Sequence, residues 1–157
     1  MSMETVQRLK FLQRVVTREI AHLQYSSQQV FDSGNFDSQI KTIDQDPEFA
    51  QAVEAFSSRF CRLQDTLGDK LLPACLDALQ EPTRAAIDNL DKAEKLGFLL
   101  SVDDWIQIRQ LRNKMVHEYI ESINILSEAL KIAHDYETQL ISFSNNMLGY
   151  LQQKQIL

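Results

Sequence analysis

His117 and Arg112 are the two side chains of this chain best suited to acid–base chemistry and anion binding. Imidazole titrates near neutral pH, so His117 can accept and then return a proton. The planar guanidinium of Arg112 can hold an oxyanion through two hydrogen bonds. Asn113 can orient His117 or the bound anion, while Arg109 and Lys114 add positive charge close by. These residue types together suit proton transfer beside a bound anion.

Apolar residues around these side chains recur at helical spacing, which predicts that a helix positions them. Arg112 falls inside a stripe of apolar side chains on a helical wheel, formed by Trp105, Ile108, Leu111, Met115 and Tyr119. An arginine on a buried stripe needs a partner, so we expect Arg112 to pair with an Asp or Glu of an earlier helix or to hold an anionic ligand.

Arg112 and His117 are five residues apart, which places them roughly 140° from one another around an ideal helix. The two side chains can serve one site if the helix ends close to them or if a second copy of the chain completes the site. We favour a helix end near Tyr119 combined with a symmetric dimer.

The remaining sequence also predicts helices, arranged as an antiparallel all-α bundle of four to five helices in a single domain spanning 1–157. A first helix is expected over 4–31, where apolar residues follow steps of three, four and seven. A polar loop should follow over 32–45, with Phe36 and Ile40 in contact with the core.

Capping residues indicate where the second long helix begins. Asp46 can cap it, Pro47 fits its first position, and an unbroken apolar stripe follows. Gly68 and Pro73 should break or kink this helix.

Three further elements are expected in the second half of the chain. Pro82 should open one of them, with Gly97 as its stop. Ser101, three residues before an acidic side chain, predicts a helix that begins near Val102. The last long helix should cover 122–150.

The last helix carries two apolar stripes, and this doubling favours a homodimer. One stripe comprises Leu126, Leu130, Ala133 and Leu140, and the other comprises Ile125, Ile132, Tyr136, Phe143 and Tyr150. One stripe can face the core of its own chain while the other packs against a second copy.

Composition narrows the class of protein. The 157 residues include 16 Lys and Arg against 22 Asp and Glu, and this net charge of −6 disfavours broad, non-specific binding to nucleic acid without excluding a small basic site. Cys61 and Cys75 indicate buried cytosolic thiols, and no spacing typical of a zinc site occurs. We therefore expect a cytoplasmic protein with no cofactor, no metal, no signal peptide and no membrane span.

The run Arg112-Asn113-x-x-x-His117-x-Tyr119 resembles the signature of HEPN domains, in particular the HepT-like toxin branch. The family pattern is an arginine, four to six intervening residues and a histidine, often with Asn after the arginine and Tyr two residues after the histidine. All these positions match here, and the similarity extends loosely to an all-α bundle that carries the motif near the end of its penultimate long helix.

The resemblance implies a metal-independent endoribonuclease that acts as the toxin of a toxin–antitoxin pair. Its usual partner is a minimal nucleotidyltransferase antitoxin, which can silence the toxin by adding adenylate to the tyrosine at Tyr119. Arg112 and His117 would be catalytic, supported by Asn113 and by the positive charge of Arg109 and Lys114. RNA cleavage by its own 2′-hydroxyl needs proton transfer and a cation at phosphorus, which suits these residues.

Other interpretations remain open for the same residues. The chain could be a non-catalytic adaptor that binds a nucleotidyltransferase and helps to present its substrate, or a helical interaction protein in which the motif has no chemical role. His117 could be an ordinary helix-end histidine, Arg112 a partner in an intramolecular ion pair, and Tyr119 a core residue.

Overall fold

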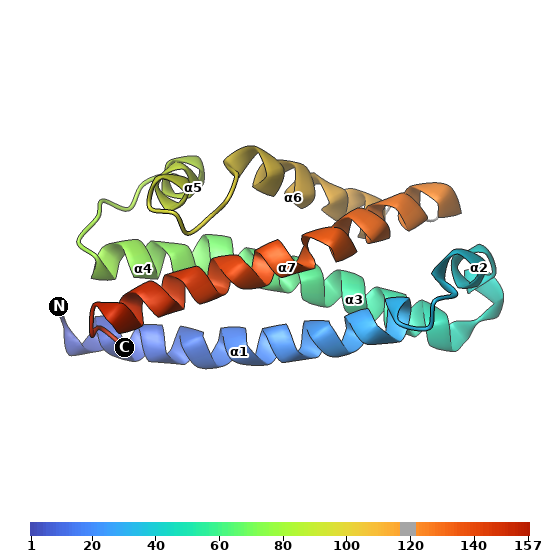
Figure 1. Ribbon diagram of the computed structural model, residues 1–157, viewed down its shortest axis with the longest axis horizontal. Coiled ribbons are helices and arrows are strands. Elements are labelled where there is room, and N and C mark those ends of the chain that lie inside the picture. The colour runs from blue at the N-terminus through green and yellow to red at the C-terminus, as the bar shows by residue number, and fades with distance from the viewer. Residues whose placement is uncertain (117–121) are drawn as a thin grey trace.

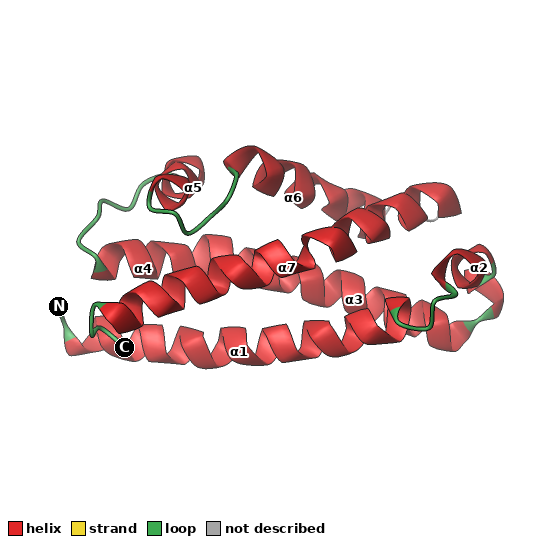
Figure 2. Ribbon diagram, viewed as in Figure 1, coloured by secondary structure: helices red, strands yellow, loops and turns green. Residues whose placement is uncertain are grey.

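The computed structural model describes residues 1–116 and 122–157, and within them the regular structure is helical, without strands (Figures 1 and 2). Four long helices dominate: α1 (Met3–Phe31), α3 (Pro47–Thr66), α6 (Val102–Val116) and α7 (Ile123–Gln153). Chain direction alternates between α1 and α3 and between α6 and α7, and both termini lie at one end of the bundle. The prediction of an antiparallel all-α bundle is confirmed.

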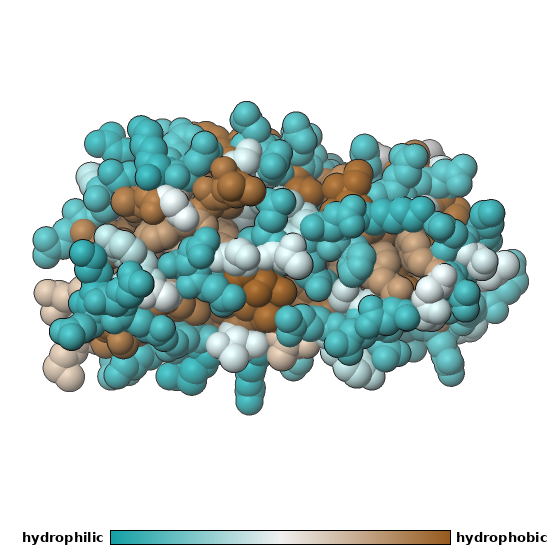
Figure 3. Space-filling model, in the orientation of Figure 1, coloured by the Kyte–Doolittle hydropathy of each residue, from teal (hydrophilic) through white to brown (hydrophobic). Residues whose placement is uncertain are grey.

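The core forms where α3 packs along α1 and also contacts α6 and α7. The apolar stripe predicted for α3 is its buried face, with Phe56, Phe60 and Leu63 fully buried. Apolar side chains that remain exposed lie scattered among polar ones on the face drawn in Figure 3.

Three of the expected helix starts, near Asp46, Ser101 and Ser122, are confirmed, and side-chain caps explain them. Asp46 accepts a hydrogen bond from the backbone N–H of Phe49 at 3.1 Å. The hydroxyl of Ser101 accepts one from Asp104 at 3.1 Å. Ser122 caps α7 in the same way. Each cap satisfies a backbone donor that the first turn of a helix leaves unpaired.

The prediction of a polar loop over 32–45 is wrong, but the expected contact of Phe36 and Ile40 with the core is confirmed. These residues form a short helix α2 (Phe36–Lys41) and a 3-10 turn η1 (Ile43–Gln45). Phe36, Ile40 and Ile43 are buried, and their spacing of four and three residues places them on one helical face. Burial of this small apolar face stabilises α2, which the mostly polar composition of the segment did not predict.

Gly68 does not break the second long helix, and neither does Pro73. The helix continues through a π-turn η2 (Leu67–Leu71), in which the N–H of Leu72 bonds to Leu67, into α4 (Leu72–Ala78). The wider turn accommodates the proline without ending the helix. Gly68 is required by packing, since a Cβ there would lie 2.9 Å from the ring of Trp105.

Pro82 does not begin a helix, because α5 spans Ala86–Lys95. The side chain of Asn89 holds the preceding loop by accepting from the N–H of Arg84 at 2.9 Å and donating to its carbonyl at 3.2 Å. Gly97 follows the helix end with a φ of 82°, as expected of a glycine stop.

The two stripes predicted for the last helix are not two separate faces. Leu126, Leu130, Ala133 and Leu140 are buried as expected. Within the second stripe, however, Tyr136 and Phe143 are also buried inside the single chain, whereas Ile125 and Ile132 are exposed by 37% and 47%. The second stripe therefore gives less support to a dimer than the sequence suggested, and the homodimer stays a prediction.

Candidate functional site

The helix that carries the motif is α6, and its buried face matches the predicted stripe. Trp105, Ile108, Leu111 and Met115 are all buried. The Trp105 ring packs edge-on against Phe143 of α7, with centroids 5.2 Å apart. α6 is described to Val116, so His117 and Tyr119 lie outside the described residues.

Arg112 is not buried, contrary to the position inside the apolar stripe that the helical wheel assigned to it. Its side chain is 47% exposed and extends toward α3. The stem of an arginine is long enough to carry the charged group from the edge of an apolar stripe to solvent. The helical wheel therefore gives the position of the Cα atom of Arg112 but not the position of its charged group.

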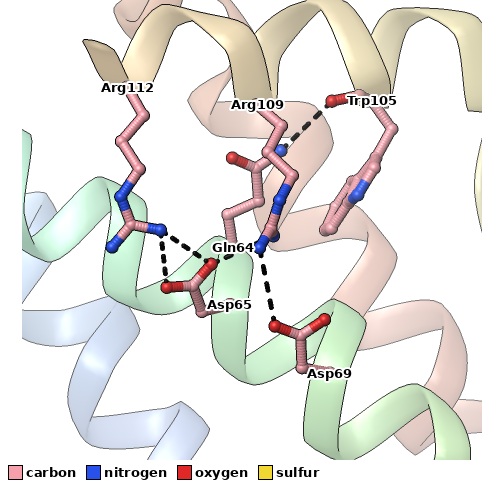
Figure 4. Close-up of polar contacts among 6 residues, drawn as sticks. All are labelled: Gln64, Asp65, Asp69, Trp105, Arg109 and Arg112. Atoms are coloured by element: carbon pink, nitrogen blue, oxygen red, sulfur yellow. Dashed lines mark hydrogen bonds and ion pairs between the residues drawn. The ribbon is translucent and has the colours of Figure 1, made fainter. Parts of the chain in front are cut away.

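Arg112 forms the ion pair that the sequence left open as one alternative. Its Nη1 donates to both carboxylate oxygens of Asp65 on α3, at 3.2 and 2.9 Å (Figure 4). Arg109, one turn earlier on α6, contacts the same carboxylate at 3.0 Å and approaches Asp69 at 3.7 Å. The four side chains form one network that joins α6 to Asp65 of α3 and to Asp69 of the following π-turn η2.

Within this network, Asp65 stabilises the charged form of Arg112. The hydrogen bond from Arg112 to Asp65, together with the attraction between their charges, raises the pKa of Arg112 above its ordinary value. The guanidinium is therefore a permanent cation. The contacts with Asp65 use Nη1, so the other nitrogens of this guanidinium make no hydrogen bond to that carboxylate and have N–H groups to offer a further anion.

Two buried contacts beneath the network fix α6 against α3. The side-chain amide of Gln64 donates to the backbone carbonyl of Trp105 at 3.3 Å and is almost fully buried. The Trp105 ring rests against Gly68, in the π-turn η2 that continues α3. The position of the two arginines thus depends on a polar contact and an aromatic contact that both lie in the core.

A hollow of about 480 Å³ opens between α3 and α6 beside Arg112. Its lining combines two arginines, two carboxylates, two hydroxyls and an apolar end, from Glu54, Ser57, Ser58, Cys61, Arg62, Asp65, Arg112, Met115 and Val116. The hydroxyl of Ser57 is buried and has no hydrogen-bond partner among the described residues. The hollow can therefore accept a polar ligand next to the motif.

Cys61 lines this hollow but is poorly suited to act as a nucleophile. Burial raises the pKa of its thiol, only partly offset by the positive charge of Arg112. Burial also raises the pKa of Cys75, to about 12. Both cysteines are buried, as the sequence predicted, and both stay protonated near neutral pH.

Asn113 and Lys114 are exposed on α6 beside Arg112, so the described part of the motif is presented to solvent. Sequence reasoning did not single out Asp65, Asp69 or Arg62. The two aspartates are spaced four residues apart, which is a signal that they share a helix face. That spacing does not reveal which other helix they face.

No group of three or more His, Cys, Asp and Glu side chains that could hold a metal ion occurs in the described residues. None of the described helices is both long and apolar enough to cross a bilayer. Comparison with models of protein families, with curated proteins and with solved structures finds no match for this chain. A proposal about the function of this chain therefore has to be argued from the motif and from the residues around it.

Proposed function

We propose that this chain is a metal-independent endoribonuclease of the HEPN type that acts as the toxin of a toxin–antitoxin pair. The observation that carries the proposal is the position of Arg112, the first residue of the Arg112-x4-His117 pattern. Its guanidinium is exposed beside a hollow, at the end of a helix firmly packed on α3. A substrate phosphate can reach it there.

The reaction is a transesterification within the RNA. A base removes the proton of a 2′-hydroxyl, the 2′ oxygen forms a bond to the neighbouring phosphorus, and the bond from phosphorus to the 5′ oxygen breaks. The leaving oxygen takes up a proton, and the product carries a 2′,3′-cyclic phosphate. His117 transfers protons, and Arg112 stabilises the negative charge at phosphorus. In a symmetric dimer, His117 of each copy can take one of the two proton-transfer roles.

The surrounding residues have supporting roles in this scheme. Arg109 holds Asp65 from the other side, so a single carboxylate is shared by two guanidinium groups. Because Asp65 is shared, its interaction with either guanidinium is weaker, and an approaching phosphate can compete with it. Asn113 and Lys114 are exposed next to Arg112, where they can contact the RNA backbone.

A cognate minimal nucleotidyltransferase neutralises the toxin, and Tyr119 receives the adenylate. Each adenylate adds about one negative charge, which repels RNA from the site. Co-expression with such a transferase should add adenylate masses to the wild-type chain and none to Tyr119→Phe. An unchanged mass in the wild type, or a gain that persists in Tyr119→Phe, would mean that neutralisation uses another route.

A second candidate function is a non-catalytic adaptor for a nucleotidyltransferase. The ion pair between Arg112 and Asp65 favours it, because a substrate phosphate must compete with a carboxylate already in place. In this case the network holds α6 on α3 and the motif helix serves as a docking element. Both candidates predict a complex with the transferase, and they differ in whether the chain cleaves RNA.

Expression of the chain alone distinguishes them. Wild type should arrest growth and degrade cellular RNA, whereas Arg112→Ala and His117→Ala should not. Arg84→Ala is a matched control, because Arg84 is an exposed arginine in the loop before α5. Growth that is unaffected by the wild type, with a stable complex on co-expression, would establish the adaptor instead.

A further inference from the structure

We propose that the outer face of α1 binds single-stranded RNA. This face, called the α1 face below, comprises Phe11, Arg14, Arg18 and Tyr25. It lies away from the motif, because α1 and α6 occupy opposite sides of the bundle with α3 and α7 between them (Figure 1). The proposal goes beyond the cleavage site and does not require that the chain cleaves RNA.

The first observation is the exposure of two aromatic rings. Phe11 is 53% exposed and Tyr25 is 61% exposed, and no other aromatic side chain in the described ranges is exposed to this degree. Each ring therefore has a face open to solvent on which a flat group such as a base can stack. Neither ring takes part in the core.

The second observation is that the four side chains share one line along the helix. Successive members are three, four and seven residues apart, which keeps them on one helical face. That face is opposite to the buried side chains Leu9, Leu12, Val16 and Leu23. From Phe11 to Tyr25 the line is about 21 Å long at 1.5 Å per residue, which is a length that several nucleotides can follow.

The third observation is a local excess of positive charge. Residues 5–18 contain Arg8, Lys10, Arg14 and Arg18 and no acidic residue, although the rest of the chain has twelve Lys and Arg against twenty-two Asp and Glu. In the described part of the chain, none of these four cations lies within ion-pair distance of a carboxylate, whereas Arg109, Arg112, Lys92 and Lys131 all do. The α1 face is thus an unneutralised basic surface on an acidic protein.

These features fit a polyanion with stackable rings better than a second copy of the chain. A symmetric contact between two α1 faces would bring Arg14 and Arg18 against the same arginines of the other copy, and like charges oppose such an interface. Single-stranded RNA supplies phosphates for the arginines and exposed bases for Phe11 and Tyr25. The guanidinium carbon of Arg14 already lies 6.0 Å from the centre of the Phe11 ring, so charge and ring are presented together.

The test measures binding of a fluorescent single-stranded oligouridine by anisotropy over a range of salt concentrations. The protein carries His117→Ala throughout, so that cleavage does not interfere. Arg14→Glu with Arg18→Glu should weaken binding by about 10-fold or more and reduce the salt slope by about 1.4, the value for two lost phosphate contacts on a single strand. Phe11→Ala with Tyr25→Ala should weaken binding by about 10-fold or more and leave the salt slope unchanged.

Lys41→Glu with Lys95→Glu is the matched control, since it makes the same change in net charge at exposed lysines of α2 and α5. It should change affinity by less than about twofold. Equal weakening by this control would overturn the proposal, because only net charge would then matter. So would a lack of effect from the aromatic pair, or a dimer of the wild type that the α1 substitutions dissociate.

The outcome is separable from the proposed function. If the wild type cleaves no RNA but the α1 substitutions weaken binding, the α1 face binds RNA and the ribonuclease proposal fails. If the wild type cleaves RNA and the α1 substitutions leave binding unchanged, the ribonuclease proposal stands and the proposal for the α1 face fails. Circular dichroism of each variant verifies the fold, which these exposed side chains do not stabilise.

Discussion

Arg109 and Arg112 on α6 contrast with Arg14 and Arg18 on α1. The two α6 arginines contact a carboxylate of α3, whereas the two α1 arginines face solvent, with no carboxylate within ion-pair distance among the described residues. All four are exposed residues of long helices, so residue type and exposure do not separate them. The neighbouring helix separates them, because α6 lies against α3, whereas none of the described helices covers the outer face of α1.

Under the two proposals, this difference suits the two regions to different tasks. Among the described residues, no carboxylate lies within ion-pair distance of Arg14 or Arg18 to compete with a phosphate, so this face suits binding with little geometric precision. A phosphate that approaches Arg112 must compete with Asp65, but it meets a guanidinium held at a defined distance from α3. Catalysis needs groups that are held in a fixed geometry, whereas binding of RNA needs positive charge that is not already paired.

The largest effect should come from removing the side chain that holds α6 against α3. Trp105→Ala deletes a buried ring that contacts Phe143 and Gly68, and should lower the free energy of unfolding by about 3–5 kcal/mol. It should also free Arg109 and Arg112 from Asp65, so that they resemble the arginines of α1. Urea unfolding followed by circular dichroism measures the loss.

Leu100→Ala is the control for this change, because Leu100 precedes the same helix but is 76% exposed. It should change the free energy of unfolding by less than about 0.5 kcal/mol. A loss below about 1 kcal/mol for Trp105→Ala would mean that α6 is held by other contacts.

Asp65→Asn should make α6 behave more like α1 without unfolding the bundle. The substitution removes the charge that competes with phosphate at Arg112 and Arg109, so RNA binding should tighten several-fold and its salt slope should steepen. Stability should change by less than about 1 kcal/mol, since both partners are partly exposed. Anisotropy titrations in the His117→Ala background measure the affinity.

Asp37→Asn is the matched control, because Asp37 also pairs with a cation, Lys131, but on another part of the surface. Its affinity for RNA should equal that of the parent. Weaker binding in Asp65→Asn would show that the carboxylate positions Arg112 for phosphate instead of competing with phosphate.

The smallest effect concerns Glu19, the partly buried acidic residue of α1. Burial raises the pKa of its carboxyl above the ordinary value, more than the hydrogen bond from Thr66 lowers it. The folded protein therefore binds this proton more tightly than the unfolded chain does, and stability falls as pH rises from about 4.5 through the raised pKa. Glu19→Gln removes that loss.

The Gln variant should be slightly more stable than wild type at pH 7 and no different at pH 4, as judged by urea midpoints. Glu128→Gln, at an exposed position of α7, should show the same difference from wild type at both pH values. A Glu19→Gln variant that is less stable at pH 7 would indicate that the ionised carboxylate stabilises the fold.

Helix patterns in the sequence predicted most of the fold. The starts at Asp46, Ser101 and Ser122 are set by local capping, which a sequence displays directly. The continuation through Gly68 was not predictable, since the ring that requires the glycine, Trp105, comes from a distant part of the chain. Side-chain caps were reliable local signals, whereas Pro82 and the polar composition of 32–45 were misleading, and contacts between distant segments were not predicted.

The same limit applies to the candidate site. The motif and the possibility of an ion pair at Arg112 were visible in the sequence, but Asp65 was not identifiable among the acidic residues. The exposure of Arg112 was mispredicted because the helical wheel places Cα atoms and ignores the reach of a long side chain. The role of His117 rests on the motif alone.

Cleavage of single-stranded RNA in EDTA by the purified protein tests the central claim most directly. Wild type should release products that end in a 2′,3′-cyclic phosphate, and Arg112→Ala and His117→Ala should each lower the rate by roughly 100-fold or more while remaining folded. Absence of cleavage, cleavage that requires added Mg²⁺, or equal rates in wild type and both variants would contradict the account.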